Sequence, residues 1–172
     1  MRYAWSLAAV ALVSLSATGF GVAQEEKCDN ASFVKKASCG NLAEIKMGKL
    51  AQETATSIAV KAFAGKMVRE HTKAQKELKE ACKTSKTECP DKLTKEGQAA
   101  CEKCEKLKGE KNFDAVYIST QIECHEMALK LYDKAAKECE CEMLKAYASQ
   151  HIPVIRQHLT MARKIQKDLD AK

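Results

Sequence analysis

Turn-forming and aromatic residues are scarce in this 172-residue sequence. It contains 7 glycines and 2 prolines, and Phe, Trp and Tyr together make up 5% of the chain. Turn-dense β-sandwiches, collagen-like chains and proline-rich disordered chains are therefore poor fits. Apolar residues amount to 45% and charged residues to 30%, a balance too apolar for an intrinsically disordered chain. The composition favours a soluble helical domain with a hydrophobic core.

A second long hydrophobic run is also missing after the one at the N-terminus. That run, residues 4–13, follows Arg2 and is itself followed by the small residues Gly-Val-Ala at positions 21–23. A membrane-spanning helix needs about 20 apolar residues, more than this run provides. We therefore predict a signal peptide over residues 1–23 and a single mature domain over residues 24–172 without a transmembrane segment. The mature chain is expected to be exported.

The sequence lacks blocks of one charge and the common catalytic motifs. The net charge is +6, but Lys and Glu alternate, as in Lys-Glu-Leu-Lys-Glu at positions 76–80. Such alternation makes solvated helix faces, so nucleic acid is not an expected partner. There is no glycine-rich phosphate loop, nucleophile elbow or paired-acid hydrolase pattern. Catalysis by the usual routes has little support, and a non-enzymatic role is favoured.

Helical periodicity is what the sequence does contain. Apolar residues recur every three or four positions in four long segments, with a shorter segment between the second and the third. The predicted helices are residues 30–55 (interrupted near Gly40 and Asn41), 57–83, 112–138 and 144–169, with a short helix over 91–107. Short joints near residues 56 and 140 make two antiparallel hairpins. We expect an all-α, ferritin-like four-helix bundle with a long crossover connection that contains the short helix.

Four polar residues occupy positions that the helical period assigns to the core: Glu44, His71, His125 and His158. Each lies about 13 to 17 residues, or about 20 to 25 Å, from the nearer turn, so all four fall near the middle of the bundle. Three imidazoles and a carboxylate suit a transition-metal ion, Fe, Zn or Cu. The Glu three residues before a His that marks di-iron proteins is absent, which argues against a ferroxidase. In the alternative interpretation, the histidines only satisfy one another by hydrogen bonding.

Other polar residues near these positions are given lesser roles. Glu70 and Glu123 are close to histidines in sequence but lie on other helix faces, so we predict that they are solvated. His151 borders Pro153, which removes a backbone donor and is expected to kink the helix. His151 is therefore left out of the predicted ligand set.

Nine cysteines, an odd number, lie between positions 28 and 141. In an oxidising compartment disulfide bonds are the default, and at least one thiol is left over. Cys28 and Cys82 lie about equally far from the first turn, and Cys39 and Cys89 fall near the same end of the bundle. Cys124, near mid-bundle, is the expected unpaired thiol.

Two cysteine pairs have the short spacing of metal-binding motifs. Cys101 and Cys104 form a CxxC, and Cys139 and Cys141 form a CxC. No βαβ pattern surrounds the CxxC, so a thioredoxin-like role is excluded. Thiolate coordination of Cu(I) or Zn stays open beside the disulfide interpretation.

Short stretches spread over nearly the whole mature chain resemble one known family. They are residues 33–37, 41–51, 60–71, 113–117, 123–125, 144–148, 152–153 and 158–159. In these stretches the chain is similar to the bacterial family of domains of unknown function numbered 4142. The resemblance implies a ferritin-like four-helix bundle in the periplasm or outer envelope of a bacterium, without an established activity. The family's motif residues fall on Glu44, His71, His125 and His158, whereas the many cysteines depart from its usual cysteine-poor pattern.

Three hypotheses for the function follow. The first is an exported ferritin-like protein that binds a transition-metal ion at mid-bundle through its His and Glu residues. The second is a disulfide-stapled envelope protein, without metal, that acts in interaction or stress protection. The third is sequestration of copper or zinc by cysteine thiolates.

Overall fold

The computed structural model describes residues 29–171, so the predicted signal peptide over residues 1–23 lies outside the described part. Five helices and no strands occur among the described residues. The helices are α1 (Asn30–Thr54), α2 (Ile58–Ser85), α3 (Lys95–Glu105), α4 (Phe113–Glu138) and α5 (Glu142–Asp170). The predicted all-α class is confirmed. The four long helices begin and end within two residues of the predicted positions, because their apolar stripes are long and regular.

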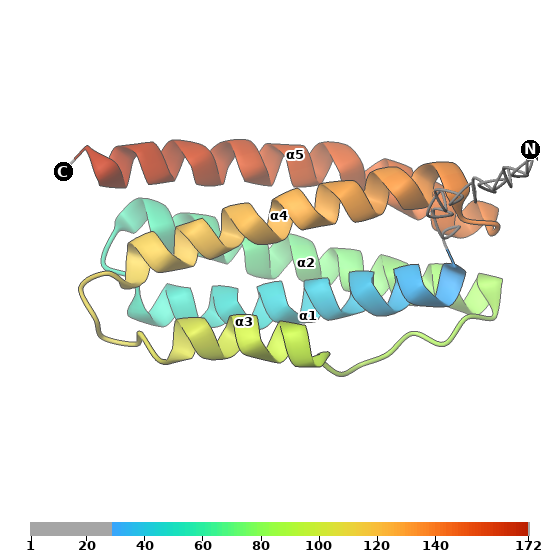
Figure 1. Ribbon diagram of the computed structural model, residues 1–172, viewed down its shortest axis with the longest axis horizontal. Helices are drawn as coiled ribbons and strands as arrows, with labels where there is room; N and C mark the ends of the chain where they lie inside the picture. Colours follow the sequence, from blue (N-terminus) through green and yellow to red (C-terminus); the bar gives the residue numbers. More distant parts are fainter. Residues whose placement is uncertain (1–28, 172) are drawn as a thin grey trace, which may run out of the picture.

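The four long helices lie side by side as two antiparallel hairpins (Figure 1). Residues 55–57 join α1 to α2, and residues 139–141 join α4 to α5. Besides these hairpin contacts, α1 packs against α4 and α2 packs against α5. The connection over residues 86–112 runs the length of the molecule and includes α3, which lies along α1 (Figure 1). As a result, α2 and α4 run in the same direction.

The expected interruption of the first helix near Gly40 and Asn41 is wrong. Helix α1 is continuous from residue 30 to residue 54. Gly40 is exposed and Asn41 is buried at 2% exposure. A single exposed glycine costs a helix only about 1 kcal/mol relative to alanine, which tertiary packing on the opposite face offsets. Helix α5 likewise continues through Pro153.

A layer of buried polar side chains divides the core. One apolar cluster surrounds Phe63, Met67 and Tyr117, and the other surrounds Phe33 and Leu144. Between them, each long helix contributes buried polar residues. They are Ser38, Asn41 and Glu44 from α1, Gln75 from α2, Gln121 and His125 from α4, and His151 and His158 from α5. The histidine positions predicted near mid-bundle fall in this layer.

Asp114 joins the two hairpins at one end of the molecule. Its carboxylate accepts hydrogen bonds from the backbone N–H groups of Thr56 and Ser57, the latter at 2.7 Å, and from the Thr56 hydroxyl at 2.8 Å. Ser57, the N-cap residue of α2, makes no capping bond with its own side chain. The start of α2 is therefore capped by a carboxylate from the other hairpin.

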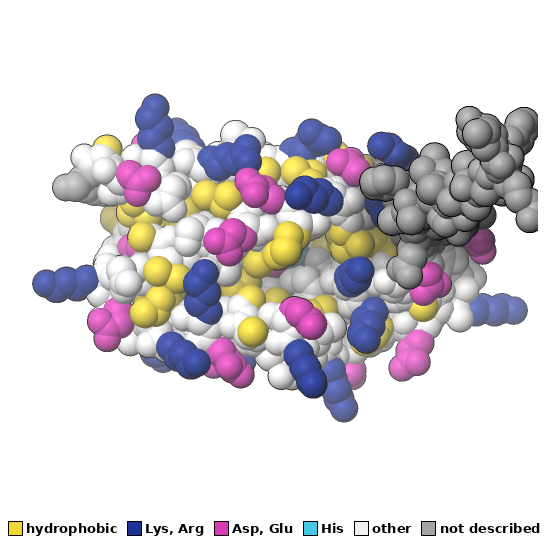
Figure 2. All heavy atoms as spheres, in the orientation of Figure 1, with side chains coloured by type: hydrophobic (Ala, Val, Ile, Leu, Met, Phe, Trp, Pro, Cys, Tyr) yellow, Lys and Arg dark blue, Asp and Glu magenta, His cyan; other side chains and the backbone are white. Residues whose placement is uncertain are grey.

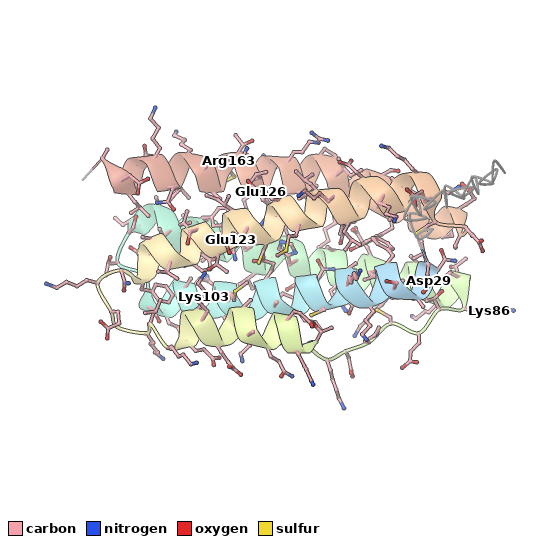
Figure 3. All side chains as sticks on the ribbon, viewed as in Figure 1. Asp29, Lys86, Lys103, Glu123, Glu126 and Arg163 are labelled. Atoms are coloured by element: carbon pink, nitrogen blue, oxygen red, sulfur yellow. The ribbon has the colours of Figure 1, made fainter. Side chains whose placement is uncertain are left out.

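The outer surface carries both signs of charge. Lys, Arg, Asp and Glu side chains are interspersed over the face shown in Figure 2, as the alternating sequence predicts. Arg163 on α5 and Glu126 on α4 make one such pair, 2.6 Å apart and labelled in Figure 3. Among the described residues, none of the helices has both the length and the apolar character that crossing a membrane requires.

Candidate metal centre

Three histidines from three helices meet in the polar layer. His71 on α2, His125 on α4 and His158 on α5 each offer one ring nitrogen, and these three atoms lie within 4.8 Å of one another. Their ring centroids are 5.2 to 5.7 Å apart. His125 and His158 are buried, while His71 is half-buried with its Nε2 shielded from solvent. Each continues the buried stripe of its helix, so the helical period alone directs all three inward.

The second ring nitrogen of His125 and of His158 is held by an oxygen that can only accept a hydrogen bond. His125 Nδ1 donates to the backbone carbonyl of Gln121 at 2.8 Å. His158 Nε2 donates to the carboxylate of Glu70 at 2.6 Å. In the neutral rings the proton therefore sits on these nitrogens, which leaves His125 Nε2 and His158 Nδ1 with bare lone pairs.

A chain of hydrogen bonds fixes the proton of His71 in the same way. The Pro90 carbonyl can only accept, so the Ser38 hydroxyl donates to it at 2.5 Å and accepts from Gln75 Nε2 at 2.7 Å. Gln75 Oε1 then accepts from Asn41 Nδ2 at 3.3 Å, which turns Asn41 Oδ1 toward His71. His71 Nδ1 donates to that oxygen at 3.0 Å. His71 Nε2 is left as a buried lone pair without a hydrogen-bond partner.

The bare nitrogens of His125 and His158 have the spacing of metal ligands. His125 Nε2 lies 3.2 Å from His158 Nδ1, yet neither atom carries the proton that a hydrogen bond between them needs. Metal–nitrogen distances of about 2.0 to 2.1 Å in a tetrahedral site place two ligand nitrogens about 3.3 to 3.4 Å apart. A cation among these nitrogens would satisfy all three lone pairs. The pattern in which a ligating His donates its other N–H to a carboxylate or carbonyl is typical of metal sites.

Burial keeps the three imidazoles neutral. It lowers the pKa of His125 to about 4, with a further contribution from His158. Burial, followed by the neighbouring imidazoles, lowers the pKa of His71 well below its ordinary value. The pKa of His158 is also lowered by burial, although the Glu70 carboxylate opposes the shift. At neutral pH all three rings are therefore free of the extra proton that would block metal binding.

Glu44, included among the predicted ligands, lies outside the group of three. Its Oε2 accepts a hydrogen bond from Gln121 Nε2 at 2.6 Å. Its Oε1 is 3.9 Å from His125 Nδ1, the nitrogen that already donates to the Gln121 carbonyl. The helical period correctly predicts that Glu44 lies in the core, where it is 4% exposed. The Gln121 amide, however, holds its carboxylate near Nδ1 of His125 and not near the bare Nε2. Burial raises the pKa of Glu44 to about 7, although the Gln121 hydrogen bond opposes the shift.

The prediction that Glu70 is solvated is wrong, whereas Glu123 is exposed as expected. The Glu70 side chain is 31% exposed, and its carboxylate bridges His158 and the Lys66 ammonium. Burial acts to raise the pKa of Glu70, but the hydrogen bonds from Lys66 and His158 outweigh it, so the pKa is lowered. The Glu123 side chain is 64% exposed and pairs with Lys103 at 4.0 Å (Figure 3). Glu70 differs because α5 packs against this flank of α2.

Sequence reasoning missed the groups that orient the imidazoles. Asn41, Gln121 and Glu70 supply the acceptors, and Gln75 supports Asn41. The available signal was the presence of two amides, at positions 75 and 121, on apolar helix stripes. His151 stands apart from the cluster: its Nδ1 donates to the Tyr147 carbonyl at 2.8 Å, and its Nε2 lies 3.1 Å from Glu77.

The expected disulfide bonds are not found among residues 29–171, where no two cysteines are bonded to each other. Cys39 and Cys89, predicted near the same end, remain separate because Cys39 Sγ accepts the backbone N–H of Thr94 at 3.2 Å. Cys28 lies outside the described residues, and so does the expectation that it is level with Cys82. Cys124 is a thiol like the other described cysteines, so its expected role as the one left over stays a prediction.

Comparisons with known proteins place this fold. The chain resembles a crystal structure of a DUF305 fragment from Deinococcus radiodurans, with a TM-score of 0.69 at 10% sequence identity over 80% of this chain and 95% of that one. No curated protein matches the chain. The sequence profile of a domain of unknown function, DUF4142, matches residues 17–165. The chain, which holds its three histidines between two helical hairpins, therefore belongs to the DUF4142 family.

Proposed function

We propose that this protein is an exported, ferritin-like four-helix bundle that binds one transition-metal ion at His71, His125 and His158. One observation carries the proposal. Each imidazole offers a bare nitrogen within 4.8 Å of the other two, while its other nitrogen donates to an acceptor fixed by the fold. This arrangement supplies three neutral ligands already oriented for a cation.

The competing interpretation, in which the histidines merely satisfy one another, is poorly supported by the hydrogen bonds. The contact of 3.2 Å between His125 Nε2 and His158 Nδ1 lacks a proton when both rings are neutral, and both pKa values are lowered. His71 Nε2 has no partner at all. A buried acceptor without a partner costs about 1 to 3 kcal/mol. A bound cation relieves both defects.

The donor set suits zinc, copper or iron. Three imidazole nitrogens are common ligands of all three, and three protein ligands leave a coordination position open to water or a small molecule. A bound ion would supply Lewis-acid chemistry or, for copper and iron, one-electron redox chemistry. The residues of the chain bind and orient: Asn41, Glu70 and the Gln121 carbonyl set the ring angles, and the Glu44 carboxylate places a titratable group beside His125.

The remaining parts of the proposal rest on sequence and topology. Two antiparallel hairpins joined by a crossover along the molecule are the arrangement of ferritin-like bundles. The charged start, apolar run and small residues over positions 1–23 have the pattern of a signal peptide. A periplasmic or outer-envelope location in a bacterium is proposed on that basis.

Elemental analysis of protein purified without an affinity tag tests the metal proposal. We expect the native chain to hold one transition-metal equivalent more than H71Q and H125Q, which lose the metal of the histidine centre. The matched control is H151Q, because His151 is also a histidine of the polar layer but lies outside the cluster. Equal metal contents in H71Q, H125Q and H151Q, or no metal uptake by native protein supplied with Zn, Cu and Fe, would refute the proposal.

A further inference from the structure

The fully buried side chains of α3 are two cysteines, beside the partly buried Ala100. Cys101 and Cys104 are the only buried residues of this eleven-residue helix, and each is 1% exposed. Residues three positions apart lie on the same face of a helix, so both thiols point the same way. A helix of this length normally docks through a stripe of larger apolar side chains. Two small thiols give α3 an unusually weak apolar anchor.

Both thiols contact α1, and one of them meets another sulfur atom. Cys104 Sγ lies 3.8 Å from Met47 Sδ, and Cys101 Sγ lies 3.9 Å from the Ala43 carbonyl oxygen. Ala43 and Met47 are one turn apart on α1, so the two cysteines match successive turns of the helix beneath them. Met47 is 1% exposed. Three sulfur atoms therefore lie in the contact between α3 and α1, shielded from water.

We propose that Cys101, Cys104 and Met47 form a second metal site, separate from the histidine centre, that binds Cu(I). Thiolate and thioether sulfur are the ligands that select this soft cation. Metal–sulfur bonds of about 2.3 Å place two ligand sulfurs about 3.8 to 4.0 Å apart in tetrahedral or trigonal geometry, in agreement with the 3.8 Å between Cys104 and Met47. Zinc is excluded as the main occupant because it prefers four ligands drawn from Cys, His, Asp and Glu.

Binding involves proton release and no electron transfer. Cu(I) forms bonds to the two cysteine sulfurs and to the thioether, and the two S–H protons leave to solvent, so copper stays in the +1 state. In the metal-free protein both thiols hold their protons, because burial raises the pKa of Cys101 to about 11 and also raises that of Cys104. The Lys46 ammonium, paired with Glu105 at 2.9 Å, acts against the shift at Cys101. It would help to balance the negative charge of the loaded site.

Anaerobic titration of the reduced, metal-free chain with Cu(I), in competition with the chromophoric chelator bicinchoninate, tests this site. X-ray absorption at the copper edge reports the ligand atoms. We expect one Cu(I) with sulfur coordination in the native chain and its loss in C101S/C104S. M47L, which keeps both thiols, should bind the same equivalent about tenfold or more weakly, the scale on which loss of a supporting group weakens metal sites. The control C89S/C141S removes two partly exposed thiols and should bind as the native chain does.

The variant H71Q distinguishes the sulfur site from the histidine centre, because it should retain the sulfur-coordinated copper. Sulfur-coordinated copper that persists in C101S/C104S, or a native chain that acquires none, overturns the proposal. Circular dichroism reports whether each variant keeps its helices. Should C101S/C104S fail to fold, M47L decides the matter, since unchanged affinity in M47L would show that Met47 is not a ligand.

Discussion

The buried carboxyl of Glu44 makes the stability of the metal-free protein depend on pH in a way that one substitution isolates. Burial raises its pKa from 4.5 to about 7. The folded chain therefore holds a proton between these values that the unfolded chain has lost, and stability falls as pH rises through this window. At about 1.36 kcal/mol per pKa unit, the full loss above pH 7 is about 3 kcal/mol. E44Q removes the titration and keeps a side chain of the same shape.

The free energy of unfolding, measured by urea denaturation in the presence of EDTA, tests this reasoning. E44Q should be close to the native chain near pH 5 and more stable than it near pH 8, the difference growing by about 2 to 3 kcal/mol. E123Q is the control, because the Glu123 side chain is 64% exposed and its substitution should change stability by less than about 0.5 kcal/mol at either pH. A difference between E44Q and the native chain that stays constant with pH would refute the reasoning.

Three further predictions concern single side chains. E70Q weakens the acceptor that orients the His158 imidazole, so the metal affinity should fall about 10- to 100-fold at unchanged stoichiometry. Competition with a chelator measures this affinity, and an unchanged value would show that Glu70 does not orient a ligand. D114A removes the carboxylate that caps α2 through the N–H groups of Thr56 and Ser57, and should lower the free energy of unfolding by about 1 to 2 kcal/mol in urea; a loss under about 0.5 kcal/mol would contradict this. G97A places a methyl group 2.5 Å from Cys39 Sγ and should lower the melting temperature. G40A meets no atom within 4 Å of its new methyl group and should raise the melting temperature. A higher melting temperature for G97A than for G40A would contradict the packing of α3 on α1.

The sequence was sufficient to predict where the three histidines lie. His71, His125 and His158 continue apolar stripes with the helical period, and their distances from the two turns give their heights. These are local properties, which a periodic sequence determines well. The groups that orient the rings depend instead on how helices pack. Glu70 lies beside His71 in sequence, yet it accepts a hydrogen bond from His158, because α5 packs against that flank of α2.

The cysteines and the backbone near Gly40 show two other limits of the sequence. The predicted export favoured disulfide bonds, but spacing alone does not show which thiols approach each other. Cys39 instead accepts the backbone N–H of Thr94, the N-cap residue of α3, a contact made only when the crossover folds back on α1. Gly40 and Asn41 suggested a break in the helix from local preference, and packing overrode that preference.

The three histidines proposed as metal ligands come from both sides of the crossover. His71 precedes the connection over residues 86–112, and the other two imidazoles follow it. Neither hairpin alone presents all three nitrogens, so a growing chain gains the complete ligand set only after residue 158 has been synthesised and the second hairpin has docked on the first. Uptake of the ion would then be a late event in biogenesis and would add a third tie between two hairpins that helix packing and the Asp114 hydrogen bonds also hold together.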